Sequence, residues 1–261
     1  SSGGAGIQAD IKTISALGGY AATAITAITV QNTLGVQAVH PVPAELVGEQ
    51  MQAVMEDLRP DAIKIGMTGN VEIISEIARL LHQYSPRQVV LDPVMVSTSG
   101  HNLMTDEAVE AICTLLLPEV SLVTPNLHEA AVLLQQPIHT VDDMEYAAHL
   151  VYEKYHCACL VKGGHLTGNE MCDVLYDGHE LHLFGARRIH SGNLHGTGCT
   201  LSSAIATFLA QGFPLYEAVE LAKIYITKAI EAGKDLHIGQ GNGPLCHFPY
   251  LVNPVNPLTE E

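Results

Sequence analysis

A short glycine-containing stretch offers the clearest chemistry in this sequence. Gly196-Thr197-Gly198-Cys199 leads into small residues, Thr200 to Ala204, that are typical of a helix. The first N–H groups of a helix lack intrahelical partners and carry partial positive charge, so the stretch predicts a phosphoryl-binding site. Cys199 lies in the first turn, where a thiol ionises more readily, and it is placed to accept a proton from a substrate hydroxyl. The alternative is a glycine turn that precedes a tightly packed helix.

Acidic and amide side chains follow two apolar segments further upstream. Asp92 comes directly after Val89-Val90-Leu91, and a carboxylate there is able to hold a metal ion or to cap a turn. Asn126 and Glu129 stand three residues apart at a predicted helix start. That spacing is typical of a capping box, which by itself favours a structural role. A metal site at Asp92 and Glu129 is the alternative if these residues border the glycine turn.

Three further features are candidates for ligand contacts. Lys162 follows an apolar segment and precedes two glycines, so it either reaches a bound phosphate or is a surface lysine before a turn. Gln31 offers its amide to a flat heterocycle, or is a polar loop residue. Ser1 to Gly6, with Asp10 one helical turn beyond, is either a second loop that approaches a ligand closely or a flexible terminus. His195 is interpreted as a solvated loop histidine, since no His/Cys cluster has zinc-like spacing.

The elements that must position these residues alternate between short β-rich runs and longer helical periods. This alternation indicates βαβ units on a mostly parallel sheet. The predicted strands are Ala22 to Thr29, Ala62 to Gly66, Gln88 to Asp92, Ser121 to Thr124 and Cys159 to Lys162. The predicted helices are Ile7 to Leu17, Ala44 to Leu58, Val71 to Tyr84, Asp106 to Leu117, Leu127 to Leu134, Asp142 to Tyr155, Gly198 to Gln211 and Leu215 to Ala232. A hairpin over residues 171–185, closed by a type I′ turn at Asp177-Gly178, completes the pattern.

Parallel α/β sheets bind ligands at the carboxyl ends of their strands. The unusual residues follow the five predicted strands in turn: Gln31-Asn32-Thr33, Gly66-Met67, Asp92-Pro93-Val94, Thr124-Pro125-Asn126 and Lys162-Gly163-Gly164-His165. We therefore expect one cleft in one α/β domain that spans residues 1–261, with a frayed tail over 253–261.

Charge and cysteine content narrow the class of protein. The 261 residues are 47% hydrophobic, which is ample for a buried core, and carry 12 Lys+Arg against 28 Asp+Glu, a formal charge of -16. Such a charge opposes binding to nucleic acid or to an anionic membrane, so phosphate binding must be local. Six cysteines without a CxxC pair favour a reducing cytoplasm, and no stretch predicts a transmembrane segment or a signal peptide.

Taken together, these motifs resemble the hydroxymethylpyrimidine/phosphomethylpyrimidine kinase family of thiamine biosynthesis, within the ribokinase-like superfamily. The resemblance runs from residue 1 to about Phe248. It rests on motifs that occur in the same order: Ser1-Ser2-Gly3-Gly4-Ala5-Gly6-Ile7-Gln8-Ala9-Asp10, Gln31-Asn32-Thr33, Lys64-Ile65-Gly66-Met67, Asp92-Pro93-Val94, Thr124-Pro125-Asn126-Leu127-His128-Glu129-Ala130, Lys162-Gly163-Gly164-His165 and His195-Gly196-Thr197-Gly198-Cys199. Family members normally begin with an apolar strand before the Ser-Ser-Gly-Gly run, and we expect that the sequence is trimmed there.

The resemblance implies a three-layer α/β/α sandwich and an ATP- and Mg²⁺-dependent kinase. It would phosphorylate 4-amino-5-hydroxymethyl-2-methylpyrimidine (HMP) and then HMP phosphate, which gives the diphosphate. The implied roles are catalysis by Cys199 as general base with an anion hole at Gly196, Thr197 and Gly198; substrate binding by Gln31, Asp10, Met67 and Gly6; ATP and phosphate binding by Lys162, Asn126 and Thr200; and metal binding by Asp92 and Glu129.

Two rival functions remain open. A pyridoxal or pyridoxine kinase shares the fold and the metal site, and its substrate is similar in size. A regulatory protein that binds the pyrimidine without turnover is the rival from another class. We also expect a homodimer, and a lid formed by residues 96–101 or by the hairpin after His165.

Overall fold

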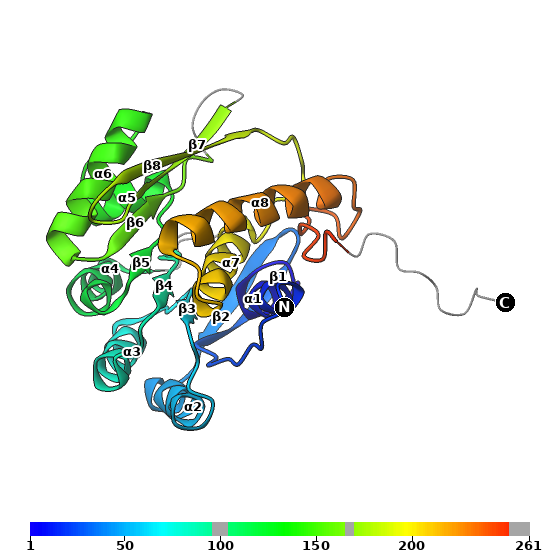
Figure 1. Ribbon diagram of the computed structural model, residues 1–261. Helices are drawn as coiled ribbons and strands as arrows, with labels where there is room; N and C mark the ends of the chain where they lie inside the picture. The colour runs from blue at the N-terminus through cyan, green and yellow to red at the C-terminus, as the bar shows by residue number, and fades with distance from the viewer. Residues whose placement is uncertain (96–103, 165–169, 251–261) are drawn as a thin grey trace.

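A six-stranded sheet forms the centre of the molecule (Figure 1). The structure is a computed structural model, and it describes residues 1–95, 104–164 and 170–250. The strand order is β3-β4-β5-β6-β7-β8, with the first four strands parallel and the last two antiparallel. The bounds are β3 (Ile63–Ile65), β4 (Val89–Leu91), β5 (Leu122–Val123), β6 (Ala158–Val161), β7 (Glu170–Tyr176) and β8 (Leu181–Arg187). The predicted mostly parallel sheet is confirmed, and the carboxyl ends of β3 to β6 share one edge.

Helices cover both faces of this sheet and complete three layers. The helices are α1 (Gly6–Ala16), α2 (Ala44–Asp57), α3 (Val71–Tyr84), α4 (Asp106–Ala111), α5 (Leu127–Leu134), α6 (Val141–Tyr155), α7 (Thr197–Ala210) and α8 (Leu215–Gly233). Val89 and Leu91 of β4 pack with α2 to α6, whereas Val90 points to the opposite face and packs with α7 and α8. Among the described residues, no helix combines the length and apolar content that crossing a bilayer requires.

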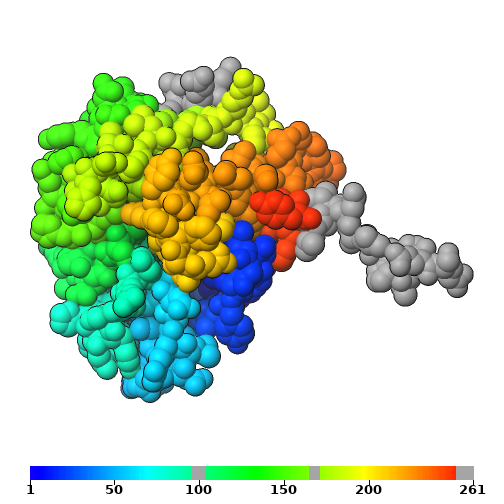
Figure 2. Space-filling view, viewed as in Figure 1, coloured from blue at the N-terminus to red at the C-terminus, as the bar shows by residue number. Residues whose placement is uncertain are grey.

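The start of the chain packs against the α7–α8 layer. Figure 2 shows the N-terminal residues (blue) against the yellow and orange surface of α7 and α8. Ser203 of α7 donates a hydrogen bond to Asp10 of α1, at 2.7 Å between Oγ and Oδ1. This packing brings the start of the chain to the glycine turn that precedes α7.

The first predicted strand lies in a different sheet from the one expected. Residues Ala27–Asn32 form β1, which pairs antiparallel with β2 (Gly35–Pro41) in a separate two-stranded sheet. The prediction that this segment belongs to the parallel sheet is therefore wrong. Ile28 and Val30 are exposed on one face of β1, an alternation typical of a half-buried hairpin strand, whereas β4 is buried on both faces.

Two local details also differ from the prediction. The expected helix Asp106 to Leu117 ends as an α-helix at Ala111 and continues as a π turn and a 3-10 turn, because Pro118 cannot extend an α-helix. The β7–β8 hairpin is confirmed, but its type I′ turn is wrong, since only Gly178 among residues 177–179 has a positive φ. The Asp177 carboxylate instead accepts the N–H groups of His179 and Glu180.

Candidate active site

The carboxyl ends of the parallel strands and the start of α7 border one cavity of about 1770 Å³. Asp92 follows β4, and an isolated bridge joins Asn126, after β5, to Lys162, after β6. All but one of the predicted site residues line the cavity: Gly6, Asp10, Gln31, Met67, Asp92, Asn126, Glu129, Lys162, Gly196, Thr197, Gly198 and Cys199. The fold thus brings together motifs that are far apart in the sequence.

Lys162 lies between the two predicted metal-binding carboxylates. Its Nζ is 2.7 Å from Asp92 Oδ1 and 3.9 Å from Glu129 Oε2, and all three side chains are largely buried. Burial opposes the charge of Lys162, but the carboxylates of Asp92 and Glu129 outweigh it and raise the pKa of the ammonium. Lys162 is therefore charged, but the neighbouring carboxylates balance its charge, so it offers a phosphate a charged hydrogen-bond donor and not a net positive potential.

Asn126 and Glu129 form the capping box that their spacing predicts. The Glu129 N–H donates to Asn126 Oδ1 at 2.9 Å, and the Asn126 N–H donates to Glu129 Oε2 at 2.8 Å. Burial raises the pKa of Glu129 to about 7, against the opposing charge of Lys162. The pair therefore has the predicted structural role. The Asn126 N–H also holds the Glu129 carboxylate at the cavity.

The carboxylates offer a partial site for a hard cation. Mg²⁺ usually takes one or two protein carboxylates and completes its shell with water and substrate phosphates. No group of three or more His, Cys, Asp or Glu side chains in the described part of the chain is arranged to hold a metal ion. Asp92 and Glu129 would supply at most two ligands to a Mg²⁺ ion, and phosphate oxygens and water would have to supply the rest.

The glycine turn before α7 presents free backbone donors to the cavity. Gly196 has a φ of +86°, and a Cβ there would collide with the carbonyl of Gly4. The N–H groups of Gly198 and Cys199 have no acceptor among the described residues. An added Cβ at Gly198 would lie 3.3 Å from Asp92 Oδ2 and 3.4 Å from Lys162 Nζ, so Gly198 borders the charged part of the cavity.

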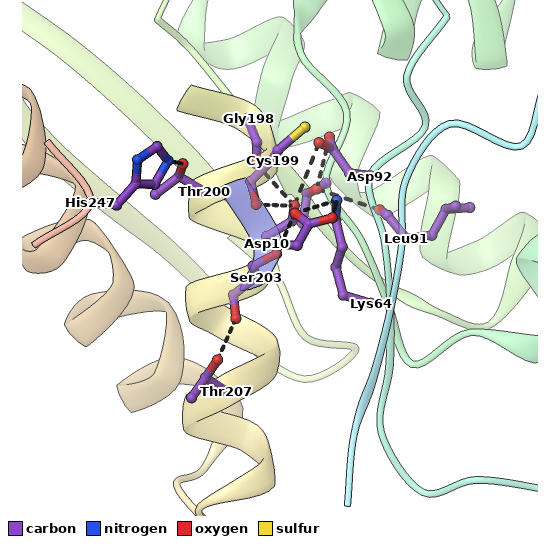
Figure 3. A network of polar contacts seen from close by, with 12 residues as sticks. Asp10, Lys64, Leu91, Asp92, Gly198, Cys199, Thr200, Ser203, Thr207 and His247 are labelled. Atoms are coloured by element: carbon purple, nitrogen blue, oxygen red, sulfur yellow. Dashed lines mark hydrogen bonds and ion pairs between the residues drawn. The ribbon is translucent and has the colours of Figure 1, made fainter. Parts of the chain in front are cut away.

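Two residues of this stretch are less available than predicted. The N–H and the hydroxyl of Thr197 both donate to the carbonyl of Leu194, at 3.3 and 2.6 Å, so its amide is not free for an anion. Thr200 is fully buried outside the cavity, and its Oγ1 lies 3.2 Å from His247 Nε2, on the side of α7 away from Asp92 (Figure 3). Thr200 therefore does not line the cavity, since a helix turns by about 100° per residue and carries Thr200 away from Cys199, and its part in ATP and phosphate binding stays a prediction.

The thiol of Cys199 lies in the first turn of α7, as predicted, but it does not ionise easily. Burial raises the pKa of Cys199, and the charges of Asp10 and Asp92 raise it further. The ammonium of Lys64 and a hydrogen bond from the Gly6 N–H oppose this rise without cancelling it. This direction is opposite to the expected lowering of the pKa, because burial and the Asp10 and Asp92 carboxylates outweigh the Lys64 ammonium and the Gly6 N–H.

Lys64 is a site residue that the sequence analysis did not assign. Its Nζ lies 2.9 and 3.0 Å from the two carboxylate oxygens of Asp10, which also accepts from Ser203 (Figure 3). Burial opposes the charge of Lys64, but Asp10 outweighs it and raises the pKa of the ammonium. The signal was a lysine inside the apolar strand Ile63–Ile65, where an unpaired charge is costly.

A second buried ion pair on the cavity wall was also missed. Asp173 of β7 and Lys223 of α8 lie 2.6 Å apart, and Asp173 accepts the Gly163 N–H at 2.9 Å. Both side chains line the cavity, and Gly163 directly follows Lys162. The pair therefore holds the backbone next to the phosphate-binding lysine, and nothing local in the sequence joins β7 to α8.

The two-stranded β1–β2 sheet forms the wall that carries Gln31. Gln31 Nε2 lies 3.2 Å from His195 Nε2, and the Met67 carbonyl accepts the hydroxyl of Thr26 at 2.7 Å. His195 is buried, so its interpretation as a solvated loop histidine is wrong. Residues 96–101 and His165, which belong to the predicted lids, lie outside the described residues.

Free helix amides, a buried lysine and two carboxylates at one sheet edge define a phosphoryl-transfer site on a three-layer α/β fold. Comparisons with known proteins agree with this class. The phosphomethylpyrimidine kinase family profile matches residues 1–246, and the chain belongs to this family. The resemblance found in the sequence is thus confirmed.

Individual relatives support the same family. A hydroxymethylpyrimidine/phosphomethylpyrimidine kinase from Rhizobium meliloti is 53% identical over 250 residues, which cover 95% of this chain and 93% of the relative. The crystal structure of a phosphomethylpyrimidine kinase from Clostridium difficile is 44% identical, with a TM-score of 0.79, and the match covers 88% of this chain and 94% of that one. A pyridoxal kinase from Bacillus subtilis, solved as an ADP complex, is 34% identical with a TM-score of 0.89, over 97% of this chain and 96% of that one.

Proposed function

We propose that this protein transfers the γ-phosphoryl group of ATP to HMP, and then a second phosphoryl group to HMP phosphate, in thiamine biosynthesis. Family membership supports the substrate class. The observation that carries the chemistry is the pair of free amides at Gly198 and Cys199 beside the ammonium of Lys162. These donors suit a phosphoryl group, whose transition state is stabilised mainly by alignment and charge.

The residues of the cavity divide between the donor and the acceptor. Asp92 and Glu129 would hold Mg²⁺, which when bound neutralises charge on the phosphate oxygens. Lys162 and the Gly198 and Cys199 amides would hold the transferred group, while Gln31 on β1 would bind the pyrimidine ring. Asp10 acts through its ion pair with Lys64, because both of its oxygens face that ammonium.

Cys199 is our candidate for the base that receives the proton of the substrate hydroxyl. Its thiol is protonated at rest, since its pKa is raised by burial. To act as a base it must first lose this proton to solvent, and the neighbouring Lys64 ammonium favours the thiolate. Proton removal is the smaller contribution to rate, because phosphoryl transfer has a loose transition state with little demand on the nucleophile.

Pyridoxal phosphorylation is the second candidate activity, favoured by the likeness to the Bacillus subtilis pyridoxal kinase. The test is an ATP-consumption assay on the full-length protein with HMP and pyridoxal in parallel, followed by analysis of the products. A higher kcat/KM for HMP, with conversion to the diphosphate, is expected. Binding of HMP without any transfer would contradict the kinase and favour the regulatory alternative.

We further infer that residues 1–261 form one kinase domain that works as a homodimer in the cytoplasm. All six cysteines are free, which agrees with a reducing compartment. Closed two-fold dimers are the commonest oligomers of soluble proteins. Light scattering after size-exclusion chromatography measures the mass directly, and a mass close to 27.9 kDa would contradict the dimer.

A further inference from the structure

One hydrogen bond on the cavity wall joins the predicted substrate-binding amide to the glycine turn. Gln31 Nε2 lies 3.2 Å from His195 Nε2. His195 directly precedes Gly196, whereas Gln31 comes from β1 of the separate two-stranded sheet. The contact therefore links Gln31, which would bind the substrate ring, with the glycine turn that would hold the reacting phosphoryl group.

His195 has little freedom to move away from Gln31. Its N–H donates to the Gly243 carbonyl at 3.1 Å, and its backbone forms an isolated bridge with Pro244. The imidazole is buried, and a Cβ added to Gly4 would lie 2.8 Å from its Cδ2 atom. The imidazole is thus a fixed partner for the Gln31 amide.

The state of this imidazole decides which end of the amide faces a ligand. An amide nitrogen only donates hydrogen bonds and an amide oxygen only accepts them. Burial lowers the pKa of His195, so the ring is neutral near pH 7, and with its proton on Nδ1 it accepts at Nε2. The Gln31 nitrogen is then occupied, and no described residue donates to the Gln31 oxygen, which is left for the cavity.

We propose that His195 is a positioning residue that holds the Gln31 oxygen toward the cavity, so that the site selects a heterocycle with an amino group beside its reacting hydroxymethyl arm. This inference rests on the proposed function of the site. HMP carries its 4-amino group next to the 5-hydroxymethyl arm and donates to that oxygen. Pyridoxal carries an aldehyde oxygen beside its arm, and two facing acceptors repel. A site built to pair one hydrogen-bonding group discriminates strongly against a ligand that lacks it.

The test compares kcat/KM for HMP and pyridoxal in the unmodified protein and in His195→Phe. Phenylalanine fills the space but offers no acceptor, so the Gln31 amide becomes free to rotate. The HMP-to-pyridoxal ratio is expected to fall about 10-fold, the size of one hydrogen bond to a neutral group. His190→Phe is the matched control, because His190 is exposed and does not line the cavity. An unchanged ratio in His195→Phe would overturn the proposal.

A rescue separates amide orientation from a general loss of packing. Combining His195→Phe with Gln31→Glu places an oxygen toward the cavity in either orientation, because both carboxylate atoms are acceptors. The preference for HMP is expected to return. His195→Ala, which removes the ring acceptor without adding bulk, must also lower this preference, and it tests the proposal even where His195→Phe does not fold. An unchanged preference in folded His195→Ala, or failure of the rescue in a folded double variant, would contradict the role of His195.

Binding without turnover distinguishes this inference from the proposed function. Calorimetric titration of HMP and pyridoxal in the absence of ATP gives an affinity ratio for each variant. Absence of phosphoryl transfer in every variant would overturn the kinase but leave the affinity ratios informative. An affinity ratio that does not differ between His195→Phe and the unmodified protein would overturn the positioning role, whether or not transfer occurs.

Discussion

Charge pairing between single residues dominates the candidate site. Lys64 and Lys162 each lie against a carboxylate, Asp10 and Asp92 respectively, within 3 Å. The chain as a whole carries a formal charge of -16, yet the described cavity wall holds the buried ammonium groups of Lys64, Lys162 and Lys223 together with free helix amides. An anionic substrate is therefore bound by local donors and not by the overall field.

The relative importance of the turn and the thiol is testable at two adjacent residues. Cys199→Ala is expected to lower the single-turnover rate by about 10²- to 10⁴-fold, the contribution of a general base. Gly198→Val is expected to abolish transfer, because its Cβ would lie 3.3 Å from Asp92 Oδ2 and 3.4 Å from Lys162 Nζ. Gly185→Val on β8 is the control, since a Cβ there meets nothing within 4 Å. Equal rates for Cys199→Ala and the unmodified protein would remove the thiol from the mechanism.

Glu129 is expected to give the protein a measurable pH dependence. Its pKa is raised from 4.5 to about 7, mainly by burial, so the folded state holds a proton that the unfolded state releases between these values. The free energy of unfolding of the unmodified protein, relative to Glu129→Gln, should therefore fall as the pH rises through this window. Urea unfolding at several pH values measures the difference. A difference that rises with pH would contradict the raised pKa.

At the scale of elements, two hydrogen bonds attach the β1–β2 sheet to residues 240–241, and we call this contact the latch. Thr33, in the turn between these strands, accepts the N–H groups of Gln240 and Gly241 at 3.1 and 3.2 Å. This latch holds the sheet that carries Gln31 over the cavity, so it contributes to substrate binding without contacting the substrate.

Removal of the latch should weaken acceptor binding more than catalysis. Thr33→Val is expected to raise KM for HMP about 5-fold, the effect of roughly 1 kcal/mol, with a smaller change in kcat. Thr114→Val is the matched control, because Thr114 is exposed, does not line the cavity, and donates its hydroxyl to the Glu110 carbonyl four residues earlier. A KM that is unchanged in Thr33→Val would show that the sheet keeps its position without this contact.

At the scale of the whole molecule, the buried pair of Asp173 and Lys223 ties the sheet to the α8 layer. Asp173→Ala would leave the Lys223 ammonium buried without its partner and release the Gly163 N–H. The expected loss is about 3 to 5 kcal/mol of unfolding free energy, measured by urea denaturation. Lys234→Ala, which breaks the exposed pair with Glu231, should have no measurable effect. Equal losses of unfolding free energy in the two variants would mean that the buried pair stabilises the fold no more than the exposed pair does.

Local sequence determined the features that depend on neighbours within a few residues. The bounds of α3 and α5 agree with the prediction. Their apolar periodicity and their N-caps depend only on residues that are close together in the sequence. The Asn126–Glu129 capping box is also local, because its two residues are three positions apart. The order of the phosphate and metal motifs along the chain was also sufficient to indicate the family, which the family profile confirms.

Only the tertiary structure decided which charged and polar groups meet. Lys64 and Asp10 are 54 positions apart, and Thr200 and His247 are 47 apart. No local pattern encodes such pairs, because burial and partner choice follow from packing of whole layers. The same holds for Cys199, whose pKa is raised by burial and further by the carboxylates that the fold brings to it. Sequence therefore identified the reactive groups, whereas their protonation and availability depend on residues distant in the chain.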